Sequence, residues 1–217
     1  MLFLILMPVV LFLLAFFGIA VAVYGSVLGM SDPDRVLKPA TRELYSREFE
    51  LAKEHHTWAS DQGFAIVGGF VFQGAAKIFV AAWQLNRVPT FFCLYRAAQN
   101  TNYDFVTVFP DGRSLTTAST KDAALLPRPT GAYLQAFPGR SASELWRLHE
   151  EALSFLSSAK GLVPEPTEKP FREILVDALA QQIAYVRSLP LWPFRGMFWY
   201  FVRREVLVNR SVAQQLS

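Results

Sequence analysis

Residues 103–119 read YDFVTVFPDGRSLTTAS, and this stretch gives the clearest indication of the fold. Two runs rich in aromatic and β-branched residues, Phe105–Phe109 and Leu115–Ala118, flank the tripeptide Pro110-Asp111-Gly112. Proline followed by Asp-Gly supplies the backbone conformations that a tight reversal needs. The two runs are therefore predicted to pair as a β-hairpin.

Further strand-like runs lie on both sides of this hairpin. They are short, apolar or β-branched, and separated by turn residues, which is typical of strands. The candidates are Phe64–Phe72, Lys77–Gln84, Thr90–Arg96, Tyr103–Phe109, Ser114–Ser119 and Ala132–Phe137. Because no helical segment interrupts them, the pattern predicts an α+β protein with an antiparallel sheet of about five to six strands flanked by helices.

The segment Phe64–Trp83 has a second interpretation as a membrane segment, because Gln73 and Lys77 are its only strongly polar residues. A central lysine costs ~2.5–3.5 kcal/mol on insertion, which its Ile, Phe and Val residues roughly offset at about 0.3–0.6 kcal/mol each. Glycines in the segment weaken a helix, and β-branched and aromatic residues favour strands. We therefore expect strands here.

Helical periodicity appears before and after the strands. Apolar residues recur at steps of three or four in Thr41–Asp61, and Ser141-Ala-Ser-Glu144 is a capping-box pattern for a helix that ends near Gly161. Another amphipathic helix is predicted over Phe171–Leu189, since Pro190 stops it.

These patterns predict five segments along the chain. They are a transmembrane anchor (1–30), a hinge (31–40), an α+β domain (41–161), a proline-rich spacer (162–170), and C-terminal helices with an aromatic and basic tail (171–217).

The anchor is predicted from Leu2–Leu28, which contains no charged residue. A membrane helix needs about 20 apolar residues, and this run exceeds that length. A cleaved signal peptide is the alternative, because Ala20-Val21-Ala22 has the form of a cleavage site. No Lys or Arg precedes the run, and the run is about twice the length of a signal-peptide core, so we favour the anchor.

Orientation follows from the basic residues that come after the apolar run. Arg35, Lys38, Arg42 and Arg47 follow it closely, and no basic residue precedes it. Positive charge tends to stay on the cytoplasmic side. We expect a single-pass membrane protein whose soluble domain is cytoplasmic.

Small residues on the predicted anchor could let two helices approach closely. Gly18, Ala22 and Ser26 recur on one face, and Gly25 and Gly29 form a second pair. Association with a second copy or with another membrane protein is one interpretation. The other is that Gly and Ala are simply frequent in membrane helices.

The tail at 191–204 reads LWPFRGMFWYFVRR and is dense in aromatic and basic residues. Aromatic rings favour the headgroup level, and arginine stems can lie along acyl chains. The residues predicted to contact the membrane interface are Trp192, Phe194, Arg195, Phe198, Trp199, Tyr200, Phe201, Arg203 and Arg204. A helix that packs on the sheet is the competing interpretation.

Charge argues against nucleic acid as a partner. The chain has 21 basic and 18 acidic residues, and the excess comes from Arg195, Arg203, Arg204 and Arg210 against the single acid Glu205. The remainder is balanced, whereas nucleic-acid binders usually carry a basic face on the folded domain. Membrane lipid is the expected partner instead.

No catalytic or cofactor motif emerges from the sequence. His55 and His56 are adjacent and point apart on a helix, and His149 lies among apolar residues, so no metal site is predicted. The glycines at 68, 69 and 74 lack the Lys-Ser/Thr of a phosphate loop and are better explained by a bulge or a close-packed helix. The single cysteine, Cys93, is expected to be buried and inert.

Two functions remain open from the sequence. The preferred one is a membrane-anchored, non-catalytic module that docks a partner protein or a lipid surface on the cytoplasmic side. The alternative is a membrane-bound enzyme or small-molecule sensor with a pocket between sheet and helices. A cavity lined by convergent polar groups would favour the alternative, and a filled interface with an exposed apolar patch would favour docking.

Overall fold

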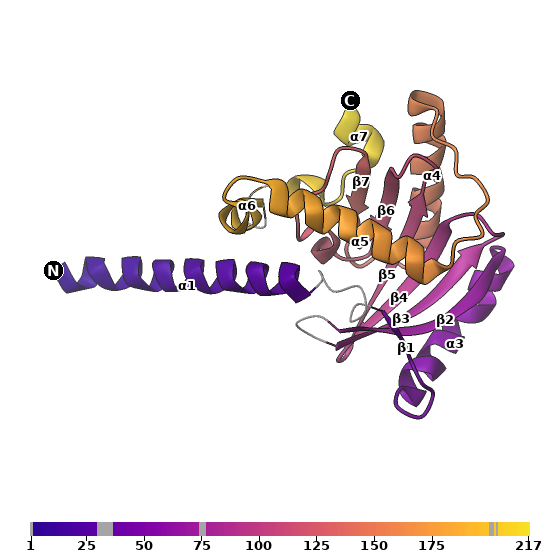
Figure 1. Cartoon of the computed structure of the whole chain (residues 1–217), viewed down its shortest axis with the longest axis horizontal. Helices are drawn as coiled ribbons and strands as arrows, with labels where there is room; N and C mark the ends of the chain where they lie inside the picture. Colours follow the sequence, from indigo (N-terminus) through magenta and orange to yellow (C-terminus); the bar gives the residue numbers. More distant parts are fainter. Residues whose placement is uncertain (1, 30–36, 74–76, 200–201, 203) are drawn as a thin grey trace.

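The computed structural model describes residues 2–29, 37–73, 77–199, 202 and 204–217 (Figure 1). The helices are α1 (Leu2–Gly29), α3 (Ser46–Asp61), α4 (Ala142–Lys160), α5 (Phe171–Ser188), α6 (Trp192–Phe198) and α7 (Val212–Leu216), with 3-10 turns η1 (Lys121–Ala124) and η3 (Arg204–Leu207). The strands are β1 (Lys38–Pro39), β2 (Phe64–Gln73), β3 (Lys77–Leu85), β4 (Thr90–Ala97), β5 (Asn100–Val108), β6 (Ser114–Ala118) and β7 (Ala132–Ala136).

The strands form one sheet of seven in the order β1-β2-β3-β4-β5-β6-β7. The α+β class and all six predicted strands are confirmed, but the predicted number of five to six strands is wrong. The additional strand β1 comes from the predicted hinge and pairs with Phe70 and Val71 of β2. A two-residue edge strand that contains proline gives no periodic signal, which explains why it was missed.

The sheet is not wholly antiparallel, which corrects a second expectation. β6 and β7 run parallel, with Ser114 opposite Ala132 and Ala118 opposite Ala136. A parallel pair needs a crossover rather than a tight turn. Residues 119–131, which include η1, provide this connection.

The hairpin at Pro110-Asp111-Gly112 joins β5 to β6 as predicted. The amide of Phe109 donates to the carbonyl of Arg113 at 2.8 Å, and Gly112 adopts a positive φ of 81°. The segment Phe64–Trp83 forms β2 and part of β3, so its interpretation as strands is confirmed.

Gly68 and Gly69 serve a structural purpose, as expected. The β2–β3 register shifts between Ile66 and Gly68, which marks a bulge. A Cβ atom on Gly69 would lie 2.6 Å from Cζ of Phe49 in α3. Only glycine lets α3 pack this closely on β2.

One face of the sheet is filled by α3 and α4. Aromatic rings dominate this layer, with Phe64, Phe92, Phe105 and Trp146 in edge, stacked and tilted contacts. The Ser141–Glu144 capping box forms as predicted, and Gly161 ends α4 in the left-handed conformation.

The opposite face is covered by α5, which crosses the strands in front of the sheet in Figure 1. Phe171 and Ile174 of α5 pack with Val80, Phe91 and Cys93 of the sheet. Residues alternate between the two faces along each strand, so Phe105 belongs to the α3–α4 layer while its neighbours Asp104 and Val106 face α5.

Helix α1 projects away from the sheet and meets the rest of the molecule along its C-terminal half (Figure 1). Val27 is buried with Leu126, Ile183 and Val186, the last two from α5. Across the part of the chain that the structure describes, no helix meets the length and hydropathy needed to cross a membrane.

Candidate functional site

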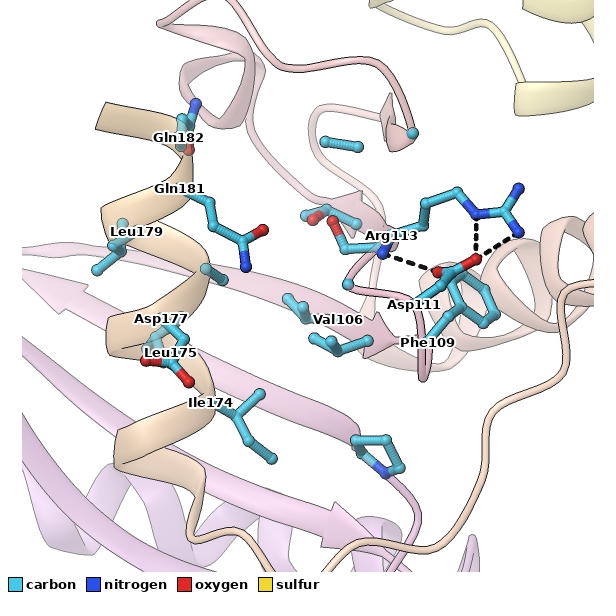
Figure 2. A pocket seen from close by; sticks show the side chains of 18 of the residues that line it. Val106, Phe109, Asp111, Arg113, Ile174, Leu175, Asp177, Leu179, Gln181 and Gln182 are labelled. Carbon is cyan, nitrogen blue, oxygen red and sulfur yellow. Dashed lines mark hydrogen bonds and ion pairs between the residues drawn. The ribbon is translucent and has the colours of Figure 1, made fainter. Parts of the chain in front are cut away.

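A cavity lies between the α5 face of the sheet and α5 itself. Its volume is about 650 Å³, within the range of ligand-binding pockets. In Figure 2, Ile174 and Gln181 point from α5 toward β5 and the β5–β6 turn, with Val106 on the opposite wall. Sheet and helix are therefore not fully packed against each other here.

The middle of the cavity is apolar. Val106 and Val108 of β5 face Ile174 and Leu175 of α5 across it, and Ala178 follows one turn later. Ile174, Leu175 and Ala178 lie on the apolar side of the amphipathic helix predicted over Phe171–Leu189. The structure brings them to the sheet side, but Leu175 and Ala178 remain partly accessible because the cavity separates them from the strands.

Polar side chains gather at another part of the wall. Tyr95 comes from β4, Asp104 from β5, and Arg128 from the crossover between β6 and β7. Asp104 lies opposite Cys93 on β4 and opposite Ala118 on β6. The strand register thus fixes a carboxyl group in the centre of the sheet, on the face that α5 covers.

Burial disfavours the charged forms of these groups. It raises the pKa of Asp104 to about 7, and the Arg128 guanidinium offsets part of this effect. It also lowers the pKa of Arg128 to about 10 and raises the pKa of Tyr95 well above its usual value. Arg128 therefore stays cationic at neutral pH, whereas Asp104 is divided between its two protonation states.

Two atoms of this polar group lack hydrogen-bond partners. Oδ1 of Asp104 and Nε of Arg128 are both buried and make no hydrogen bond within the described part of the chain. The other end of the guanidinium is held, since Nη2 donates to the carbonyl of Ala123 at 2.7 Å. Because unmet buried polar atoms are costly, this pair indicates a place where an external molecule supplies an acceptor and a donor.

Two ion pairs lie among the exposed residues of the cavity lining. Nε of Arg113 donates to Asp111 at 2.6 Å, an interaction drawn in Figure 2. Lys169 of the spacer lies 3.5 Å from Asp177 of α5. These exposed pairs differ from the Asp104–Arg128 pair, which has no hydrogen bond or ion pair between its members.

The residues predicted for the membrane interface lie partly on α6. Trp192 stacks on Tyr24 of α1 with ring centroids 5.3 Å apart, and Phe194 stacks on Phe16 at 5.9 Å. Phe198 and Arg195 are exposed. The structure therefore brings this part of the tail beside α1.

The described residues at the end of the tail contact the crossover between β6 and β7. Trp199 donates from Nε1 to the carbonyl of Ala124 at 2.7 Å. Arg204 is buried at 6% exposure, and its Nη1 lies 3.4 Å from Asp122. Tyr200, Phe201 and Arg203 lie outside the described residues.

Two of the residues predicted for helix association are exposed and have free space around them. Gly18 and Gly25 are exposed, and a Cβ atom on either would meet nothing within 4 Å. Gly29 is half-buried. The side chains of Ala22 and Ser26 lie outside those that the structure describes.

The histidines have structural partners. His149 is buried, with Nε2 2.9 Å from the Thr107 hydroxyl and Nδ1 2.9 Å from that of Thr117. Nδ1 of His56 accepts from the Trp83 indole at 3.3 Å. No group of three or more His, Cys, Asp or Glu suited to a metal ion occurs in the described part of the chain.

Sequence reasoning missed the polar group of the cavity. Asp104 gave a weak signal, because it is the one acid within the predicted strand Tyr103–Phe109. Arg128 gave none, since it lies in a loop among prolines and its position depends on the crossover. Tyr95 and Cys93 looked like ordinary members of an apolar strand.

Comparisons with known proteins return no relative. No family of known proteins, no curated protein and no solved structure matches this chain. The cavity and its residues are therefore the basis for the function proposed below.

Proposed function

We propose that this protein binds a small molecule in the cavity between the sheet and α5, and that α1 holds the binding domain at a membrane. The observation that carries the proposal is the pair of buried, unpartnered atoms in the cavity wall, Oδ1 of Asp104 and Nε of Arg128. A convergent polar pair beside an apolar wall is the usual composition of a ligand pocket.

The cavity favours the second of the two functions left open by the sequence. The face covered by α3 and α4 is filled with aromatic rings, but the face covered by α5 holds a volume of about 650 Å³. A module that acts only by docking has no need of an interior space with polar groups.

Ligand-observed ¹⁹F NMR on the full chain in lipid nanodiscs, with a library of fluorinated fragments, tests this proposal. Ala178→Trp should fill the cavity and remove the binding of fragments, while Ala180→Trp, on an exposed position of the same helix, should leave it unchanged. Thermal unfolding of both variants checks that each is folded. The absence of fragments that distinguish the two variants would contradict a binding function.

The membrane attachment rests on α1. Its 28 residues include no charged residue. A run of about 20 or more uncharged, mainly apolar residues is typical of membrane anchors, and this feature of the sequence supports the attachment. The basic residues after α1 support a cytoplasmic domain.

Fusion of a reporter after Ser217 tests this orientation. We expect activity from a reporter that functions only in the cytoplasm, and none from one that functions only outside it. The opposite result would contradict the orientation while leaving the binding proposal intact.

Helix α6 supplies a second attachment in this proposal. Leu191, Phe194 and Phe198 are exposed at 75%, 44% and 58%, beside rings that stack on α1. An exposed apolar group next to a membrane helix is well placed to enter the interface, where its aromatic residues are favoured. Self-association through Gly18 and Gly25 remains a separate prediction.

A further inference from the structure

The inference concerns the ligand class and rests on the proposed function. The two unmet atoms of the cavity are of opposite kinds. Oδ1 of Asp104 can only accept a hydrogen bond when the carboxyl is ionised, and the Nε–H of Arg128 can only donate one. Both residues are described by the structure, yet no hydrogen bond or ion pair joins them. A bound group that satisfies both atoms presents a donor to Asp104 and an acceptor to Arg128.

We propose that the cavity takes a neutral amphipathic molecule whose polar end is an amide-type edge, with its N–H donating to Asp104 and its C=O accepting from Arg128, and whose apolar remainder lies against Val106, Ile174 and Leu175. An amide places its donor and its acceptor on two different atoms held in one plane, so it can bridge two groups that make no hydrogen bond to each other. A hydroxyl has to serve both from a single atom.

Charge supports a neutral ligand over a charged one. Asp104 and Arg128 carry opposite charges, so a carboxylate ligand would gain from Arg128 and be repelled by Asp104, and an ammonium ligand would meet the reverse. Burial has already raised the pKa of Asp104 and lowered that of Arg128, which shows that this wall solvates charge poorly. A ligand that brings a full charge would add a desolvation cost.

The apolar part of the ligand follows from the opposite wall. Val106 and Val108 face Ile174, Leu175 and Ala178 across the cavity. Asp177, the acid of α5 that belongs to the cavity lining, is exposed and pairs with Lys169. An aromatic or branched aliphatic group would bury its surface here.

A matched set of probes tests the ligand class on the full chain in nanodiscs at pH 8, where Asp104 is mainly ionised. The probes share one ring and one ¹⁹F reporter: 4-fluorobenzamide, 4-fluorobenzoate, 4-fluorobenzylammonium, 4-fluorobenzyl alcohol and zwitterionic 4-fluorophenylglycine. We expect the benzamide to bind most tightly, by about tenfold over the others. Asp104→Leu and Arg128→Met should each remove this preference, whereas Arg113→Met, in an exposed ion pair, should keep it.

The outcomes separate the two proposals. If another probe binds best to the wild type and Ala178→Trp abolishes that binding, the cavity is a ligand site but the amide class is wrong. If no probe distinguishes the wild type from Ala178→Trp, the binding function itself fails. If Asp104→Leu and Arg128→Met unfold the chain, Asp104→Ala and Arg128→Ala remove the same acceptor and donor without adding apolar bulk, and an unchanged benzamide preference in both would overturn the assignment.

Discussion

Asp104 of β5 lies directly opposite Cys93 of β4, so an ionisable carboxyl group and a buried thiol share the sheet face that α5 covers. Burial raises the pKa of the thiol far above neutral pH, so Cys93 contributes no charge. Tyr95, on the same strand face, is neutral for the same reason. Of the groups that surround Asp104, Arg128 is the one that stabilises its ionised form.

The first prediction concerns stability as a function of pH. The pKa of Asp104 is about 7 in the folded protein and close to 3.8 when the chain is unfolded. Between these values the folded state holds a proton that the unfolded state has released, so stability falls as pH rises from about 4 to about 7 and is level above that. The loss is at most ~4 kcal/mol, and less where water in the cavity screens the carboxylate.

The measurement is the free energy of unfolding of the wild type relative to Asp104→Asn, at pH values from 5 to 8. His149 acts in the opposite direction, since burial lowers its pKa to about 3 and stability is lost as pH falls below the unfolded value of 6.5. That contribution is common to both proteins and cancels in the difference. A difference independent of pH would show that Asp104 ionises normally.

The second prediction concerns Gly69 and Phe49. Gly69→Ala places a Cβ atom 2.6 Å from Cζ of Phe49, a ring that also packs edge-on against Phe79 at 5.2 Å. We expect a loss of about 1–3 kcal/mol in chemical denaturation because the ring has to move. In a Phe49→Leu background the same alanine should cost clearly less. An equal cost in both backgrounds would mean that strain at β2, and not the helix contact, is responsible.

The third prediction concerns His149, which lies between the hydroxyls of Thr107 and Thr117 in the core. His149→Leu removes both hydrogen bonds and should lower the unfolding free energy by about 2–4 kcal/mol. Glu150→Gln, on the exposed side of α4, should change it by less than about 0.5 kcal/mol. Equal stability of His149→Leu and the wild type would indicate that Thr90 satisfies Thr107 and that Gln135 satisfies Thr117 without the histidine.

The fourth prediction concerns Trp192, which stacks on Tyr24 of α1. If α1 spans the bilayer and α6 lies at its interface, brominated lipids in the nanodisc should quench the fluorescence of Trp192. Trp192→Phe should then reduce the quenched fraction, and Trp83→Phe should increase it, because Trp83 is fully buried in the sheet core. A quenched fraction unaffected by Trp192→Phe would place α6 away from lipid.

The sequence alone determined the local elements of this protein. Pro110-Asp111-Gly112 set the β5–β6 hairpin, the Ser141–Glu144 box set the start of α4, and Pro190 limited α5, since each depends on residues that are neighbours in the chain. Short apolar and β-branched runs bounded by turn residues located the six longer strands for the same reason.

The tertiary structure alone decided the seventh strand, the parallel pairing of β7 and the cavity. β1 exists only because Lys38 and Pro39 meet β2 from a distance in the chain, and β7 takes its direction from the crossover at 119–131. That same crossover carries Arg128 to the face that the β4–β5 register gives to Asp104. Only folding brings these side chains together. They come from segments that share no local pattern, so the sequence gives no indication that they meet. The candidate site depends on such an encounter.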